Sequence, residues 1–520
     1  MQSKPVRMKP VKVFLAFLSI LALLVMIAYI FPSGGIQILP GIRLNFPSVA
    51  DLVNYDQNEY KDISELIDEN APVDTIAPVI EDTLSLKTSP DSIGLKKDTA
   101  TTQAEDTQPR ATRPQPKMRE NSIQYPRGDH SILQSFFQSL RKVKKENELI
   151  RILHYGDSQI EGDRISSYIR NQLQKEFGGA GIGLIPAVLP HNTSISLKHS
   201  ITSNWSRFAL NNMKDANFQH RRFGVLMSFS RFSPYYSNYQ DNVYEASITL
   251  KNSPITFDLN NEFTRCRVFF GYNNKPFIVQ MNYGNKTADA DMIPPIDTLR
   301  QIDWAVPPFT DELTLTFRGN HSPDIYGLAL DGEEGVALDN IPLRGSRGTG
   351  FTKTDTAFLH SMMRELNVKL ILMHFGVNLV PSIKANYDFY EQRFYEQLEM
   401  FKSIGDDINI IVMGVTDMSR KKGGGFQSYP NIEKIRDAQK RAAFRANCAF
   451  WDTYEAMGGE NSMPGWVFTE PPLARKDFTH FTYKGSVVIA KMFYKALMKD
   501  YHAYLLKQQK RKINTKADST

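Results

Sequence analysis

The chain of 520 residues contains only two cysteines, Cys266 and Cys448. So few cysteines exclude a fold that depends on a framework of disulfides. One bridge between the two remains open as an alternative, but we expect two buried free thiols, because free cysteine is among the most often buried residues. No cluster of cysteine and histidine has the spacing of metal ligands, so we expect no metal and no cofactor.

A strong excess of one charge is also missing. The formal net charge is +6, from 62 Lys and Arg against 56 Asp and Glu. Such a mild excess indicates no nucleic-acid partner. Hydrophobic residues make up 41% of the chain and aromatic residues 11%, which is enough for a substantial core. The length predicts about two to four folding units.

Long hydrophobic runs are absent except for one, Val13 to Phe31. At about 1.5 Å per residue this run approaches the ~30 Å hydrocarbon thickness, and basic residues precede it. We therefore expect residues 1–35 to be a basic stub and a transmembrane anchor, with the N-terminus in the cytoplasm and the rest on the periplasmic side of the inner membrane. A cleaved secretory signal is the alternative, and both interpretations export the remainder.

Residues 36–124 lack a sustained hydrophobic period. Between Asp51 and Arg110 there are fourteen Asp or Glu against five Lys or Arg, with scattered Pro, Ser and Thr. Such a segment cannot bury enough apolar surface to offset its ordering entropy, which predicts a disordered tether. One short amphipathic helix near residues 52–67 is compatible with the pattern. At the other end, residues 507–520 form a basic tail.

The remaining residues predict an interrupted α/β domain. In 125–190 an apolar strand ends at Gly156, and a helix follows with Ile165, Ile169 and Leu173 on one face. In 339–506 near-continuous apolar strands alternate with amphipathic helices, as in a parallel sheet covered on both faces. This predicts a three-layer α/β/α sandwich. The short alternating strands of 191–338 predict an inserted all-β sandwich.

A serine lies at the turn between the first strand and its helix. Ser158 would place its hydroxyl at the carboxyl edge of the sheet, near a helix N-terminus that stabilises negative charge. A helix cap is the alternative role for this residue. Three other polar segments, which contain Gly348, Asn378 and the pair Asp477 and His480, also follow predicted strands or precede the last helix, so we expect all of them at the same edge.

These four segments, GDSQ, GSRGTG, GVN and DFTH, resemble in type and order the motif blocks of the SGNH or GDSL hydrolase superfamily. The resemblance implies that Ser158 is the nucleophile, His480 its general base and Asp477 the carboxylate that orients the imidazole. It also implies an oxyanion hole formed by the N–H groups of Ser158 and Gly348 and the side-chain amide of Asn378. Gly348 is preferred to Gly345 by its place in the motif.

The sequence departs from lipase-like members, since Gln159 replaces leucine and leucine replaces aspartate after Asn378. The string GDSQIEGDR is similar instead to exported bacterial members linked to O-acetylated cell-wall or surface polysaccharides. This implies an esterase that removes O-acyl groups, in the first place O-acetyl, from a polymer such as peptidoglycan. Gln159 and Arg164 are candidate substrate contacts; the alternative for Arg164 is a helix-start pair with Asp163.

Two other functions remain open at this stage. The first is an O-acetyltransferase with the same triad, which would need a membrane acyltransferase as partner. The second is a non-catalytic polysaccharide-binding protein that works through the β insertion. His154 and His374 are expected to be packed core residues. The aromatic residues of the insertion could stack on sugar rings, but we expect them in the core as well; they are Trp205, Trp304, Tyr235 and Tyr236.

Overall fold

The computed structural model describes residues 10–30, 36–39, 42–44, 61, 63, 64 and 66, and then 121–517 except 191–193, 211–219, 236–241, 285, 289 and 406. The predicted tether lies mostly outside the described residues, as do the first nine residues of the basic stub and Tyr236. The first elements are α1 (Pro10–Ile30), β1 (Ile36–Leu39) and β2 (Ile42–Leu44).

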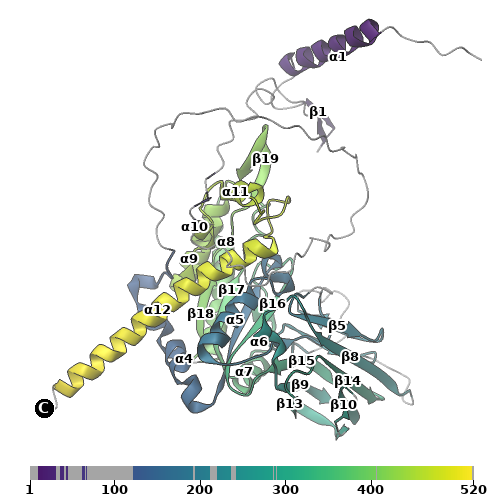
Figure 1. The fold of residues 1–520 in the computed structure, drawn as a ribbon, viewed down its shortest axis with the longest axis vertical. Coiled ribbons are helices and arrows are strands. Elements are labelled where there is room, and N and C mark those ends of the chain that lie inside the picture. Colours follow the sequence, from purple (N-terminus) through teal and green to yellow (C-terminus); the bar gives the residue numbers. More distant parts are fainter. Residues whose placement is uncertain are drawn as a thin grey trace, which may run out of the picture.

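A five-stranded parallel sheet forms the centre of the molecule (Figure 1). Its strand order is β16-β3-β17-β18-β21, and every neighbouring pair is parallel. Parallel pairing brings the carboxyl ends of all five strands to one edge. The strands are β3 (Leu149–Gly156), β16 (Gly335–Pro342), β17 (Val368–His374), β18 (Asn409–Met413) and β21 (Ala449–Trp451).

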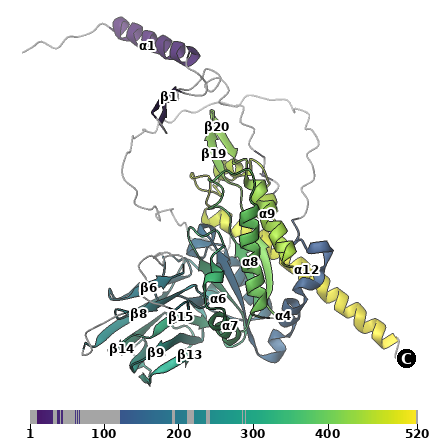
Figure 2. The same ribbon diagram turned by 180° about the vertical axis from the view of Figure 1, so that it is seen from behind.

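Helices cover both faces of this sheet, because apolar side chains alternate along its strands. Leu153 and Tyr155 of β3 belong to one core, whereas Ile150 and Ile152 belong to the other. Figure 2 shows α8 and α9 over the first face, and Figure 1 shows α5 and α12 over the second. The first core also contains α7 (Thr356–Glu365), α8 (Asp388–Ser403) and α9 (Ile432–Arg445); the second contains α4 (Gln134–Glu146), α5 (Ser166–Phe177) and α12 (Tyr483–Ala517).

Two antiparallel sheets lie between β3 and β16 in sequence and pack face to face around a third core. One has the order β11-β10-β14-β8-β5, with β12 on β10; the other has β13-β9-β15-β7-β6, with β4 on β15. The insertion is therefore a β-sandwich. Its elements are β4 (Gly183–Ile185), β5 (Leu197–Ile201), β6 (Ser206–Ala209), β7 (Ser228–Arg231), β8 (Tyr244–Asn252), α6 (Asp258–Asn261), β9 (Arg265–Asn273), β10 (Phe277–Tyr283), β11 (Lys286–Thr287), β12 (Asp291–Ile293), β13 (Ile296–Ala305), β14 (Glu312–Gly319) and β15 (Asp324–Asp331).

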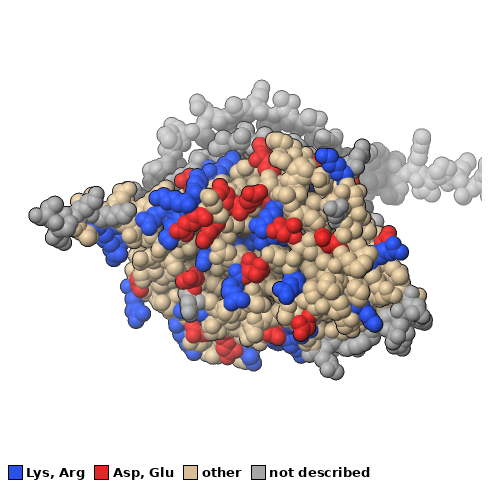
Figure 3. All heavy atoms as spheres, turned by 90° about the horizontal axis from the view of Figure 1, so that it is seen from below, with Lys and Arg blue, Asp and Glu red and all other residues tan. Residues whose placement is uncertain are grey.

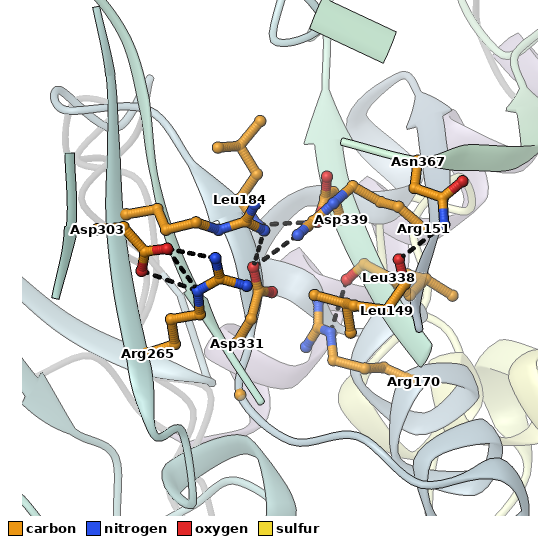
Figure 4. A network of polar contacts seen from close by, with 12 residues as sticks. Leu149, Arg151, Arg170, Leu184, Arg265, Asp303, Asp331, Leu338, Asp339 and Asn367 are labelled. Carbon is orange, nitrogen blue, oxygen red and sulfur yellow. Dashed lines mark hydrogen bonds and ion pairs between the residues drawn. The ribbon is translucent and has the colours of Figure 1, made fainter. Parts of the chain in front are cut away.

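A buried ion network joins the sandwich to the parallel sheet (Figure 4). Arg151 of β3 is fully buried and pairs with Asp331 of β15 and Asp339 of β16. Arg267 of β9 contacts the same Asp331 carboxylate at 2.8 Å. The backbone N–H of Leu184 donates to Asp339 at 2.8 Å. Strands of the parallel sheet and of the β-sandwich are thus connected by one buried network of ion pairs.

The remaining elements are short or lie at the edges. They are η1 (Pro126–Gly128), η2 (His130–Leu133), η3 (Ser158–Asp163), η4 (Phe351–Lys353), β19 (Ser419–Lys422), β20 (Gly425–Ser428), α10 (Thr453–Ala456) and α11 (Ser462–Phe468). The last helix, α12, continues to Ala517 and includes most of the predicted basic tail, and its far end projects from the molecule (Figure 1). The domain boundaries given above stay predictions.

The expected transmembrane helix over Val13 to Phe31 is a prediction that the structure corrects. A membrane-spanning helix needs about 20 consecutive apolar residues. Among the helices that the structure describes, none is both long enough and apolar enough to cross a membrane. The fold class is therefore a mixed α/β protein with one parallel sheet and an antiparallel β-sandwich, without the predicted membrane span.

The two cysteines are separate buried thiols, as predicted. Cys266 lies in the core of the sandwich and Cys448 in the first core of the α/β part. Burial raises the pKa of each thiol to about 12. Both side chains therefore remain protonated and inert at neutral pH.

Candidate active site

The nucleophile turn begins where β3 ends. Asp157 precedes the 3-10 helix η3, and its carboxylate accepts the backbone N–H of Gln159 at 3.1 Å. Gly156 has no room for a side chain, since a Cβ there would lie 2.9 Å from Ile160 and 3.0 Å from the carbonyl oxygen of His374. This close packing fixes Ser158, which is 8% exposed, at the carboxyl edge of the sheet.

The three residues predicted as a triad form one hydrogen-bonded chain. The Oγ of Ser158 lies 2.8 Å from Nε2 of His480, and Nδ1 of His480 lies 2.7 Å from Oδ2 of Asp477. The other carboxylate oxygen of Asp477 accepts the backbone N–H groups of Thr479 and His480, both at 3.0 Å. Phe478 has φ of 54°, which lets the loop fold back on the carboxylate. These distances suit proton transfer from serine to imidazole.

The protonation of Asp477 decides how the imidazole is oriented. Burial raises its pKa, but the hydrogen bonds from the ring and backbone of His480 and from Thr479 lower it further, to about 2. The carboxylate is therefore ionised at neutral pH and can only accept a hydrogen bond. Nδ1 of His480 must then carry the proton it donates to Asp477, which leaves Nε2 free to accept the proton of Ser158.

A third carboxylate, which the sequence did not single out, connects the ends of β3 and β17. One oxygen of Asp157 accepts the N–H of Gln159, and the other accepts the N–H of Gly376 at 3.1 Å. Its own N–H donates to the carbonyl of His374 at 3.1 Å. Asp157 thereby ties the nucleophile turn to the loop that carries Asn378. Its place inside the GDS motif was the only signal in the sequence.

Gln159 and Arg164 are buried and bonded to the protein. The amide nitrogen of Gln159 donates to Oγ1 of Thr416 at 3.0 Å and to the carbonyl of Thr479 at 2.7 Å. The guanidinium of Arg164 donates to the carbonyls of Ser158, Glu161 and Phe481 at 2.8 to 3.3 Å. Both side chains thus connect the nucleophile turn to the segment around His480. This geometry favours a positioning role over the substrate contact expected from the sequence.

The two remaining oxyanion candidates meet at Ser346. The amide nitrogen of Asn378 donates to the carbonyl of Ser346 at 3.0 Å, and the N–H of Gly348 donates to its Oγ at 3.1 Å. The structure therefore brings both candidates together, but the N–H of Gly348 already has an acceptor. Asn378 keeps a second amide hydrogen beyond the one bonded to Ser346. Their oxyanion roles stay predictions.

Of the other residues weighed in the sequence, two histidines and one tryptophan lie in cores, whereas Trp304 and Tyr235 are only partly buried against them. His154 and His374 are buried, and their rings stack with centroids 5.8 Å apart. Trp205 packs edge-on against Phe232 and Phe317 inside the sandwich. Within the described part of the chain, no group of three or more His, Cys, Asp or Glu side chains could hold a metal ion.

Comparison with known proteins bears on the fold of this chain. No protein-family model matches the chain, and no curated protein matches it in sequence. Among solved structures, a peptidoglycan O-acetylesterase matches with a TM-score of 0.56 and 19% identity, over 71% of this chain and 96% of that one. The fold is therefore SGNH/GDSL hydrolase-like.

Two other solved structures match over less of the chain. A GDSL-like lipase from Parabacteroides merdae has a TM-score of 0.23 and 15% identity, over 31% of this chain and 72% of that one. An acetyl xylan esterase has a TM-score of 0.22 and 14% identity, over 31% of this chain and 81% of that one. With TM-scores this low, neither structure indicates the fold or the function of the present chain.

Proposed function

We propose that the protein is a serine esterase that removes O-acyl groups, in the first place O-acetyl, from a carbohydrate polymer. The observation that carries this proposal is the unbroken chain of hydrogen bonds from Ser158 through His480 to the ionised Asp477. A serine hydroxyl is a weak nucleophile alone, and such a chain activates it.

The reaction would proceed in two steps. Ser158 Oγ attacks the ester carbonyl while His480 accepts its proton. The bond between the carbonyl carbon and the sugar oxygen then breaks, and His480 returns the proton to that oxygen. Water next attacks the acyl-serine with His480 again as base, and carboxylate is released. Asp477 stabilises the imidazolium in both steps. The N–H of Ser158 and the second amide hydrogen of Asn378 would be the donors to the negative charge that develops on the carbonyl oxygen.

Peptidoglycan is the polymer we propose first. The support is the fold shared with a peptidoglycan O-acetylesterase, together with the GDSQIEGDR string. A cell-wall substrate would require the site to lie outside the cytoplasm, which fractionation of cells that express the full chain would test. Transfer of the acyl group to a second sugar would use the same triad, so the assay must distinguish the two.

The experiment uses the purified full chain and O-acetylated peptidoglycan, with a chromogenic acetyl ester in parallel. Free acetate and acetyl groups on an added glycan acceptor are both measured, for the wild type and for Ser158→Ala. Acetate release that is lost in the variant supports the esterase. Acetyl on the acceptor would indicate a transferase. No Ser158-dependent chemistry on either substrate would contradict the proposal and favour a binding protein.

A further inference from the structure

A small pocket of about 60 Å³ lies beside the nucleophile turn, between the parallel sheet and the β-sandwich. Glu161 and Gly162 of η3 line it, three and four residues after Ser158. Pro342 lines it from the end of β16, where it pairs in register with Gly156. Arg207 of β6 lines it from the sandwich. The pocket therefore lies next to the 3-10 helix that begins at Ser158, and residues of both the parallel-sheet part and the β-sandwich line it.

Each acidic group of this pocket has its own cation. Asp163 accepts two hydrogen bonds from the guanidinium of Arg170, at 2.8 and 3.0 Å. The carboxylate of Glu161 lies 3.6 Å from Nε of Arg344. Neither carboxylate is thus available as the counter-ion of another arginine. A further positive charge in the pocket therefore has no carboxylate of the pocket to balance it.

Arg207 is this unbalanced positive charge. Among the residues that the structure describes, its guanidinium makes no hydrogen bond or ion pair, and its Nε is buried without an acceptor. Burial lowers the pKa of Arg207 to about 10, so the side chain remains a cation at neutral pH. A partly buried cation without a counter-ion is unfavourable, and an anion that binds beside it would relieve this cost.

The shape and size of the pocket narrow the choice of anion. A guanidinium presents paired N–H groups that match a carboxylate with two parallel hydrogen bonds. One water needs roughly 10 to 15 Å³ of such volume, so about 60 Å³ has room for a carboxylate-sized group.

We propose that Arg207 binds a carboxylate of the acylated saccharide while the ester lies at Ser158. This inference rests on the proposed esterase function and narrows its substrate class to polymers that carry a carboxylate near the O-acyl group. The β-sandwich thereby contributes a specificity residue to the site. Neutral acylated polysaccharides are poorer substrates, because they leave the guanidinium without a partner.

The test compares two acetylated oligosaccharides that differ only in one group, a uronic acid carboxylate or the corresponding carboxamide. The wild type should have a kcat/KM at least about tenfold higher for the acid, as expected for hydrogen bonds to a charged group. Arg207→Met should abolish this preference, mainly through a higher KM for the acid. Arg207→Lys keeps the charge and should retain part of the preference.

Arg318→Met is the control, because Arg318 is exposed on β14, does not line the pocket, and lies at the long distance of 4.0 Å from the carboxylate of Glu245. It should keep the wild-type preference. In a thermal melt, the deacetylated acid should raise the Tm of the wild type but not of Arg207→Met, which also shows whether the variant folds. An equal preference in Arg207→Met and wild type would overturn the inference. If the wild type releases acetate from no ester at all, the proposed function itself fails.

Discussion

The pKa values of two carboxylates of the site, Asp477 and Asp157, are shifted in opposite directions by their surroundings. Hydrogen bonds from the His480 loop outweigh burial and lower the pKa of Asp477 to about 2. Burial of Asp157 outweighs the N–H groups of Gln159, Gly376 and Val377 and raises its pKa to about 7. One carboxylate therefore stays charged to orient the base, whereas the other titrates near neutral pH.

The raised pKa of Asp157 predicts a pH dependence of stability. Between about pH 4 and pH 7 the folded state binds a proton that the unfolded state has released, so stability falls as pH rises through this window. Each unit of pKa shift corresponds to about 1.4 kcal/mol. Asp157→Asn removes the titrating group, so its Tm should change less between pH 5 and pH 8 than that of the wild type.

Melting curves of both proteins at a series of pH values make this measurement. Asp477→Asn serves as the comparison, because a group with a lowered pKa loses its contribution only as pH falls from about 4 through 2. It should therefore leave the slope between pH 5 and pH 8 unchanged. A wild-type slope that persists in Asp157→Asn would assign the effect to another group.

At the scale of elements, Arg164 fastens the turn at β3 to the segment that follows His480. Its guanidinium donates to Ser158 in the turn and to Phe481 beyond the histidine. Arg164→Met leaves these carbonyls without their donor and loosens the spacing of Ser158 and His480. We expect kcat for a small acetyl ester to fall by roughly ten to a hundredfold with little change in KM.

Steady-state kinetics with a chromogenic ester test this role. Arg164→Lys can remake one of the contacts and should recover part of kcat. Arg441→Met is the control, since Arg441 is a half-exposed residue of α9 that pairs with Glu391. A change confined to KM in Arg164→Met would instead indicate the substrate contact expected from the sequence.

The loop after β16 depends on glycine for two different reasons. Gly345 and Gly348 both have positive φ, of 75° and 73°. A Cβ at Gly348 would lie 2.9 to 3.0 Å from the rings of Phe375 and Phe394, whereas at Gly345 it would meet nothing within 4 Å. Gly345→Ala should therefore cost about 1 kcal/mol of backbone strain, and Gly348→Ala about 1 to 3 kcal/mol more.

Urea unfolding of the two alanine variants measures this difference directly. The strain of positive φ is common to both, so the gap between them reports the clash with the two rings. Equal losses of stability would mean that the rings move away without cost. A larger loss for Gly345→Ala would contradict the packing described here.

At the scale of the whole molecule, buried charges hold the sandwich on the parallel sheet. Arg151→Met would leave the carboxylates of Asp331 and Asp339 facing each other in the interior (Figure 4). Loss of one partner of a buried ion network costs about 3 to 5 kcal/mol. Arg265→Met breaks only the pair with Asp303, which is about one-third exposed, and should cost less than about 1 kcal/mol.

Chemical unfolding of the full chain tests this contrast. The free energy of unfolding should fall for Arg151→Met by several times the change for Arg265→Met. Similar values for the two variants would mean that the buried network does not stabilise the joint.

Charges on the outer surface are arranged differently: on the face in Figure 3, Lys and Arg are interspersed with Asp and Glu.

Much of the α/β part could be predicted from the sequence, because its signals are local. Apolar strands and amphipathic helices alternate along the chain, and the polar motifs with Ser158, Asn378 and His480 follow or flank them. The carboxyl ends of parallel strands share an edge, so these motifs could be placed together there before any distance was known, and the family resemblance supplied the triad roles.

The remaining features depend on contacts between distant segments. The partners of Arg164 and Gln159 are mostly backbone carbonyls, which leave no trace in residue type. The pairing of β4 with β15 and the missing partner of Arg207 follow only from how the sandwich packs on the sheet. The transmembrane prediction was wrong, since no helix in the described part of the chain is long and apolar enough to cross a membrane.

The central claim is that Ser158 is a nucleophile activated by His480. A fluorophosphonate tests it without knowledge of the substrate, since serine Oγ displaces fluoride from phosphorus and the proton passes to the base. Peptide mass spectrometry should find one phosphonylated residue, Ser158, in the wild type, no label in Ser158→Ala, and much slower labelling in His480→Ala. A wild type that stays unlabelled, or a label on another serine, would contradict the account.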